Sequence, residues 1–247
     1  MTKTLCIDQG NTATKICIFS DDKIEVAERH AADEAERAVA KLIAEYAPKG
    51  AIISSVTNDN ADLMMNIRDE VEYVKKLDEH LHLPIMNAYG SPETLGADRI
   101  ALAVAGYTAY PDKNVLVISL GTCITYNFVQ KNRAFRGGAI SPGMNMRLKA
   151  MHEFTQNLPL VAAEGDLLLL GYDTDTSLRS GAINGMTAEI DGMIAAFADQ
   201  YVDFNAVLTG GDMPLFANKL KSKIFADPDL LMKGLNIILK HNVPQLQ

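Results

Sequence analysis

The stretch that decides the fold is Ile7–Phe19, which reads IDQGNTATKICIF. An apolar run ends in Asp8, turns at Gly10 through small hydroxyl and amide residues, and resumes as a second apolar run. Asp and Gly are common hairpin residues, so an ordinary hairpin is one interpretation. A phosphate-binding turn is the other, because backbone N–H groups can converge on an anion and a carboxylate at the strand end can hold its Mg²⁺.

A second copy of this pattern lies about half a chain further on. Residues 5–24 and residues 116–135 share an apolar strand, a Gly turn and a returning strand. The matched residues are Asp8 with Ser119, Gly10 with Gly121, Asn11 with Thr122, and Thr14 with Thr125. Such a duplication predicts two similar lobes, and a cleft between lobes is a natural ligand site.

Alternating strand and helix patterns around the hairpin predict an α/β fold. Strands are expected at 3–8, 14–19, 24–28 and 50–56, and helices at 32–47 and 60–71. The 247 residues suffice for two lobes with buried cores, which we assign to residues 1–114 and 115–247.

Composition excludes some classes of partner. The net charge of −8, without a basic block, argues against binding nucleic acid or an anionic membrane surface. Apolar runs are too short and broken for a membrane span. The start has no leader pattern, and Cys6, Cys17 and Cys123 lie in apolar runs as reduced core residues would, so a cytoplasmic location is expected.

Three further motifs could contact a ligand. Asp98 and Arg99 follow Gly96 near a helix start. There Asp98 could accept a proton and Arg99 could bind a carboxylate. The alternative is that Asp98 only stabilises the helix N-terminus and that Arg99 is an ordinary surface residue. Gly residues precede a helix at 137–143, where a plain loop is the alternative. Gly210 and Gly211 follow an apolar strand, a usual setting for a turn beside a nucleotide.

The order of these motifs resembles the type III pantothenate kinase family over essentially the whole chain. The matching elements are Asp-x-Gly-Asn-Thr at 8–12, Tyr-x-x-Pro-x-x-Leu-Gly-x-Asp-Arg at 89–99, Gly-Thr-x-x-Thr at 121–125, Gly-Gly-x-Ile-x-Pro-Gly at 137–143 and Thr-Gly-Gly at 209–211. The resemblance implies an actin-like (ribonuclease H-like) ATPase fold. It also implies transfer of phosphate from ATP to the hydroxyl of pantothenate, the first step toward coenzyme A.

The resemblance also implies roles for individual residues. Asp8 would position Mg²⁺–ATP, Asp98 would be the general base, and Arg99 would bind the pantothenate carboxylate or order the site. The phosphates would be lined by Gly10, Asn11, Thr12, Lys15, Gly121 and Thr122, with Gly210 and Gly211 also on the nucleotide. Pantothenate would be contacted by Tyr89, Gly96, Gly138 and Gly143, and by Thr174 from the neighbouring subunit of a homodimer.

One departure from the family concerns a monovalent cation. Ser119 stands where the family usually has an acidic residue that is linked to potassium or ammonium binding. Its loss weakens the expectation of such a site and leaves open whether a nearby carbonyl or another carboxylate compensates. Two alternatives also remain open: an actin-like phosphotransferase with another acceptor, and a nucleotide-binding accessory or regulatory protein of the same family.

Overall fold

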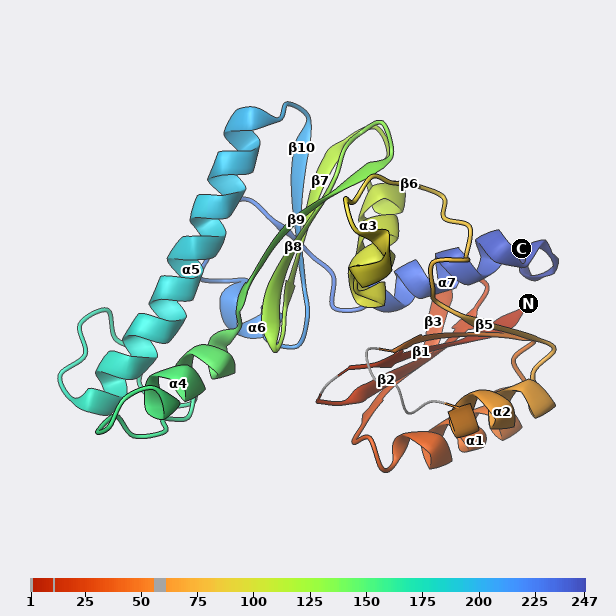
Figure 1. The fold of residues 1–247 in the computed structure, drawn as a ribbon, viewed down its shortest axis with the longest axis horizontal. Coiled ribbons are helices and arrows are strands. Elements are labelled where there is room, and N and C mark those ends of the chain that lie inside the picture. Colours follow the sequence, from red (N-terminus) through yellow and green to blue (C-terminus); the bar gives the residue numbers. More distant parts are fainter. Residues whose placement is uncertain (1, 11, 56–60) are drawn as a thin grey trace. The chain divides into compact units, whose positions relative to one another are not determined.

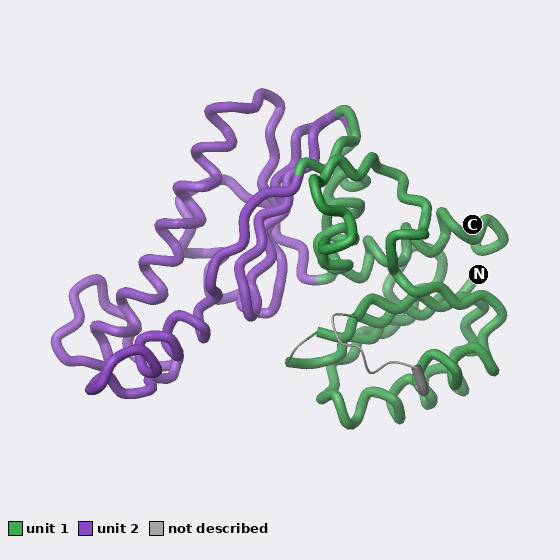
Figure 2. Tube along the Cα trace, viewed as in Figure 1, with its two compact units in different colours: residues 1–111, 132–136, 229–247 green, residues 112–131, 137–228 purple. Residues whose placement is uncertain are grey.

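Two open sheets with the same strand order form the framework of the chain (Figure 1). The computed structural model describes residues 2–10, 12–55 and 61–247. The chain divides into two compact units, coloured separately in Figure 2. Unit 1 comprises Met1–Pro111, Asn132–Arg136 and Asp229–Gln247, and unit 2 comprises Asp112–Lys131 and Gly137–Pro228.

The sheet of unit 1 has the order β3-β2-β1-β4-β5. Its strands are β1 (Lys3–Gln9), β2 (Thr14–Ser20), β3 (Lys23–His30), β4 (Gly50–Ser55) and β5 (Tyr73–Lys76). The first three strands are antiparallel neighbours, whereas β4 pairs in parallel with β1 and β5 pairs in parallel with β4. This order places the end of β1 between β2 and β4, so residues at the β1 terminus are flanked from both sides.

Helices cover both faces of this sheet. Helices α1 (Ala35–Tyr46) and α2 (Ala61–Glu70) pack their apolar side chains against one face. On the other face, α7 (Leu230–Asn242) contacts β1 and β4, and α3 (Ala97–Ala109) packs on α7. Gly234 allows this close approach, because a Cβ there would lie 2.1 Å from the carbonyl oxygen of Ala101. Unit 1 also contains η1 (Pro92–Thr94), η2 (Pro244–Leu246) and β6 (Met86–Asn87), which pairs with the start of β9.

Unit 2 repeats the same strand order. Its strands β7 (Asn114–Leu120), β8 (Cys123–Val129), β9 (Ala134–Pro142, which begins in unit 1), β10 (Phe204–Thr209) and β11 (Phe225–Ala226) follow the order β11-β10-β7-β8-β9. The buried core lies between this sheet and the helices α4 (Met144–Glu153), α5 (Thr174–Gln200) and α6 (Met213–Phe216). The predicted duplication is therefore present in the topology.

The predicted α/β architecture is confirmed, with differences at the ends of elements. Helix α1 begins at Ala35 rather than at residue 32. The last residue of the predicted strand 50–56 and the first residue of the predicted helix 60–71 lie outside the described residues. The compact units also differ from the predicted split at residue 114, because α7 packs on β1, β4 and α3 and so belongs with the first sheet. Cys6 and Cys17 are buried free thiols. No helix among residues 2–10, 12–55 and 61–247 is long and apolar enough to cross a membrane.

Candidate active site

Asp8 lies at the end of β1, where the sequence predicts a metal-positioning carboxylate. Its register partners are Lys15 on β2 and Ser54 on β4. Burial and, second, the negative charge of Asp98 raise the pKa of Asp8 from 3.8 to about 6, although Ser54 and Lys15 act to lower it. Asp98 thus lies close enough in unit 1 to disfavour the charge of Asp8, an arrangement that a bound cation would relieve.

Two buried polar atoms lie at the ends of β1 and β4. Gln9 Oε1 and Ser54 Oγ have no hydrogen bond of good geometry among the described residues, and Ser54 is fully buried. Ser54 is the strand partner of Asp8 and its hydroxyl acts to lower the pKa of that carboxyl, whereas Gln9 points to the opposite face of the sheet. Mg²⁺ prefers oxygen ligands and usually retains water, so Asp8 and Ser54 fit a hydrated Mg²⁺–ATP.

Neither Gln9 nor Ser54 stands among the residues predicted from the sequence. The polar end of the buried strand, the two serines of GAIISS, is the signal that could have identified Ser54. No group of three or more His, Cys, Asp or Glu side chains suited to a metal ion occurs in the described part of the chain. A magnesium ion here would therefore be held through Asp8 together with the phosphates.

Asp98 lies in the first turn of α3, two residues after the N-cap residue Gly96. A Cβ at Gly96 would lie 2.6 Å from Asp98 Oδ1, so glycine makes room for the carboxylate at the helix N-terminus. Burial raises the pKa of Asp98, although the N–H and charge of Arg99 and the N–H of Asp98 itself act against this. A carboxylate with a raised pKa is a better proton acceptor than a solvated one.

The predicted residues Tyr89 and Arg99 come together in unit 1. Arg99 is buried, and its Cζ lies 5.6 Å from the centroid of the Tyr89 ring. The same ring lies 6.1 Å from Phe135, centroid to centroid. The guanidinium is therefore held over an aromatic face beside Asp98, where a cation–π contact restricts its orientation.

The second hairpin turn, between β7 and β8, carries hydroxyl groups at the corresponding strand end. Ser119 pairs with Thr125 on β8 and with Thr209 on β10, so it occupies the place that Asp8 has in the first sheet. Both strand partners are threonines, so neither of them carries a carboxylate group. The strand pairs of Ser119 therefore offer only neutral oxygens to a cation.

The second turn is also one residue shorter than the first. Gly10 N donates to Ala13 O at 3.2 Å, whereas Gly121 N donates to Cys123 O at 3.1 Å. The predicted match of Thr14 with Thr125 is therefore wrong: Thr14 pairs with Gln9, but Thr125 pairs with Ser119 and so corresponds to Lys15. Alignment of the two sequences alone could not show this slip, because the length of each turn is set by the pairing of its two strands.

Three predicted glycines of unit 2 are required by backbone packing. A Cβ at Gly143 would lie 2.1 Å from Gly121 O, and a Cβ at Gly138, whose φ is +147°, would lie 1.9 Å from Tyr126 O. At Gly210, with φ of +99°, a Cβ would meet the Leu120 carbonyl oxygen at 2.2 Å. Gly143 and Gly210 thus both pack directly onto the backbone around the Gly121 turn.

The remaining predicted residues are more dispersed. Thr12, Thr122 and Gly211 are exposed, and Asn11 lies outside the described residues. Thr174 is the exposed first residue of α5, after the N-cap Asp173, whose side chain accepts a hydrogen bond from Thr176 N at 2.8 Å.

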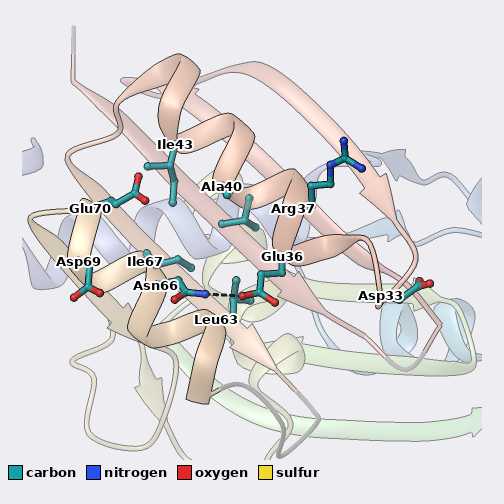
Figure 3. Close-up of a pocket in the computed structure, with 11 residues that line it drawn as sticks. Asp33, Glu36, Arg37, Ala40, Ile43, Leu63, Asn66, Ile67, Asp69 and Glu70 are labelled. Carbon is teal, nitrogen blue, oxygen red and sulfur yellow. Dashed lines mark hydrogen bonds between the residues drawn. The ribbon is translucent and has the colours of Figure 1, made fainter.

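Unit 1 contains two cavities of different character. A groove of about 450 Å³ between α1 and α2 has an apolar floor and a rim that includes Asp33, Glu36, Arg37, Asp69 and Glu70 (Figure 3). A larger cavity of about 820 Å³ is lined by Gly96 and Ala97 among others. Neither Asp8 nor Asp98 is among the lining residues, although the larger cavity reaches Gly96, two residues before Asp98.

The duplicated sheet with a Gly turn after the first strand defines the class of protein. It is the fold of actin-like ATPases and sugar kinases. A glucokinase from an Antarctic psychrotroph matches with a TM-score of 0.54 at 10% identity, covering 98% of this chain and 99% of that chain. Component A of (R)-2-hydroxyglutaryl-CoA dehydratase from Acidaminococcus fermentans also matches with a TM-score of 0.54, at 13% identity, covering 100% and 99%.

Within this class, the chain belongs to the type III pantothenate kinase family. The family model matches residues 4–196. A type III pantothenate kinase from Bacteroides fragilis is 43% identical over 239 residues, covering 96% of this chain and 98% of the relative. One from Cytophaga hutchinsonii is 40% identical over 239 residues, covering 97% and 99%. The resemblance seen in the sequence is confirmed.

Proposed function

We propose that this chain is a kinase that transfers the γ-phosphoryl group of Mg²⁺–ATP to the hydroxyl of pantothenate, giving 4′-phosphopantothenate for coenzyme A synthesis. The observation that carries the proposal is the pair Asp8 and Asp98, two half-buried carboxylates of unit 1 with raised pKa values. Membership in the type III pantothenate kinase family supports the choice of reaction and acceptor.

Nucleotide-binding roles are assigned within each unit separately. In unit 1, Asp8 positions the Mg²⁺ of ATP, with its strand partner Ser54 beside it. Lys15, the cross-strand partner of Asp8, supplies positive charge to the phosphates. Thr12 and Thr122 are exposed in the turns after β1 and β7 and would donate backbone N–H groups to the phosphates. Gly10 N and Gly121 N donate to Ala13 O and Cys123 O and so shape these turns, and Gly210 and Gly211 are assigned to the nucleotide.

Pantothenate is assigned to the start of α3. Asp98 accepts the proton of the acceptor hydroxyl as its oxygen bonds to the γ-phosphorus, and the bond from phosphorus to the bridging oxygen breaks so that ADP leaves. Arg99, held against the ring of Tyr89, pairs with the pantothenate carboxylate. Gly96 keeps the helix N-terminus open, and Gly138 and Gly143 form part of the pocket wall.

We assign no carboxylate-based monovalent cation site to unit 2. The register partners of Ser119 are Thr125 and Thr209, whose hydroxyls are neutral. Potassium is bound most tightly where negative or carbonyl oxygens converge, and hydroxyls alone bind it weakly. The proposed enzyme therefore works without a strong requirement for potassium or ammonium.

We also propose a homodimer in the cytoplasm. Large apolar side chains before α5 are exposed in the single chain: Phe154 by 88%, Leu169 by 90%, Leu170 by 85% and Tyr172 by 74%. Exposed apolar clusters of this kind are typical of protein interfaces. They lie in the segment that leads into Thr174, so a dimer through this surface would bring Thr174 to the partner's acceptor. Sedimentation of Leu169→Glu tests this, since the substitution should give monomers.

An ADP-release assay tests the proposed reaction. We expect ADP release from Mg²⁺–ATP to depend on pantothenate and not on glucose or other sugars. Asp98→Asn should abolish turnover while leaving the circular dichroism spectrum and melting temperature near those of the unchanged protein. Stimulation by a sugar without stimulation by pantothenate would refute the proposed acceptor. Full turnover by Asp98→Asn would refute the assigned base.

A further inference from the structure

A group of polar side chains in unit 2 has no role in the reaction as described above. Arg147 on α4 and Glu189 on α5 form an ion pair, and Tyr126 Oη on β8 donates to Glu189 Oε1 at 3.0 Å. The Tyr126 residue is only 1% exposed, and the side chains of Arg147 and Glu189 are 21% and 29% exposed. The group thus links two helices and a central strand at a largely buried place.

The electrostatics show that this is a satisfied network. Burial acts to raise the pKa of Glu189, but hydrogen bonds from Arg147, Ser141 and Tyr126 together with the charge of Arg147 lower it overall. Burial, with the adjacent Glu189 charge, raises the pKa of Tyr126. Glu189 is therefore held as a carboxylate that accepts from a neutral phenol, and it neutralises the guanidinium of Arg147.

The guanidinium also holds the backbone that precedes α4. Arg147 Nε donates to Pro142 O at 2.8 Å, and Nη2 donates to Ser141 Oγ at 3.1 Å. The next residue, Gly143, donates its N–H to Thr122 O at 3.1 Å and leaves no room for a Cβ against Gly121 O. The contacts thus run without a break from Glu189 through Arg147 and the Pro142–Gly143 backbone to the Gly121–Thr122 turn.

We infer that Arg147, fixed by Glu189 and Tyr126, is a positioning residue that sets the Gly121–Thr122 turn for the phosphates of ATP. This inference rests on the proposed assignment of ATP phosphates to that turn. Preorganised N–H donors bind an anion well only when they are held at the correct place, and a displacement of about 1 Å can cost about 100-fold in rate. Arg147 acts through the backbone, because its charge is already paired with Glu189.

Steady-state kinetics of four variants separate positioning from direct phosphate binding. Arg147→Met should raise the KM for ATP about tenfold and leave the KM for pantothenate within about twofold. Arg147→Lys, which keeps the charge but not the planar fork, should recover only part of this loss. Glu189→Gln should also raise the KM for ATP, whereas a direct phosphate ligand released from its partner would bind ATP more tightly. Tyr126→Phe should give the smallest effect.

A matched arginine on the same helix as Glu189 provides the control. Arg179 of α5 also donates to a backbone carbonyl, Asp166 O at 3.3 Å, but that carbonyl belongs to the segment before α5. Arg179→Met should leave the KM for ATP within about twofold. The double variant Arg147→Met with Glu189→Gln should resemble Arg147→Met alone, because both changes break one network.

Direct binding of Mg²⁺–ATP, measured by calorimetry, separates this inference from the proposed reaction. Weaker ATP binding by Arg147→Met, with a melting temperature close to that of the Arg179→Met control, supports the inference even if pantothenate proves not to be the acceptor. An unchanged affinity for ATP in Arg147→Met and Glu189→Gln would overturn the inference while leaving the kinase assignment standing. Tighter ATP binding by Glu189→Gln would overturn it in favour of direct phosphate binding.

Discussion

Asp8→Asn should increase the stability of the nucleotide-free protein while it impairs the binding of Mg²⁺–ATP. The pKa of Asp8 is raised from 3.8 to about 6, chiefly by burial and then by the charge of Asp98. The folded state therefore holds the Asp8 proton more tightly than the unfolded state does. Stability is then lost as the pH rises from about 4 through about 6, because the folded protein must carry a poorly solvated charge.

The size of the effect follows from the pKa shift. Each pKa unit corresponds to about 1.4 kcal/mol, so a shift of about two units costs the folded protein about 3 kcal/mol above pH 7. At about pH 4.5 most of this cost is absent, since Asp8 is then protonated in the folded state, and about 1 kcal/mol remains. An asparagine has the same shape and no charge. The stability gained by Asp8→Asn should therefore grow by about 2 kcal/mol between about pH 4.5 and about pH 7.5.

Urea unfolding at the two pH values measures this change directly. The difference between the two pH values is the informative quantity, because any packing effect of the new amide is the same at both. Asp33→Asn, which removes an exposed carboxylate of the same unit, is the control and should show no such growth. Adding Mg²⁺–ATP should raise the melting temperature of the unchanged protein more than that of Asp8→Asn.

Two results would contradict this reasoning. A stability difference that stays constant from about pH 4.5 to about pH 7.5 would mean that Asp8 is not the group whose charge is disfavoured. Equal stabilisation of both proteins by Mg²⁺–ATP would mean that the carboxylate of Asp8 does not position the metal.

Three further changes test other parts of the structure. Gly210→Ala places a side chain on a residue with positive φ, against the backbone of β7, and should lower the free energy of unfolding by about 3 kcal/mol. In the same urea titration the control Gly90→Ala, which has open space around it, should change the free energy of unfolding little. Replacing sodium by potassium at constant ionic strength should leave turnover nearly unchanged, and Ser119→Asp should introduce stimulation by potassium; strong stimulation of the unchanged protein would contradict this. Asp173→Ala removes the acceptor for Thr176 N and should speed amide hydrogen exchange in the first turn of α5. Exchange as slow as in the unchanged protein would show that the N-cap does not stabilise this turn.

Much of the fold could be predicted because its signals are local. Short apolar runs bounded by turn residues identified β1, β2 and β4, and the repeated Gly turn indicated two similar sheets. The place of α7 could not be predicted, because its apolar face indicates burial and not the sheet that buries it. Only the structure shows the buried hydrogen bond from Thr4 Oγ1 to Asn236 Oδ1, at 2.6 Å, by which α7 is joined to β1.

The candidate site was predictable to a different degree. Motif order identified Asp8, Asp98 and Arg99, and the structure brings these three into one unit. Motif order could not reveal Ser54, because its relation to Asp8 arises from parallel pairing between strands that are far apart in the chain. The sequence also does not show whether a glycine is needed to make room for a ligand or for a neighbouring backbone segment, because both require a residue without a side chain.

The slip of one residue between the two turns explains how similar hairpins come to offer different chemistry. In the first sheet the strand end Asp8 faces Lys15 on one side and Ser54 on the other, so opposite charges meet beside a hydroxyl. In the second sheet the shorter turn brings Thr125 opposite Ser119, and β10 adds Thr209. The strand partners of Ser119 carry no charge, so in our proposal Asp8 of the first hairpin positions the metal, and the second turn binds an anion chiefly through its backbone N–H groups. A turn that binds through its backbone depends on being held in place, which is the task we assign to Arg147.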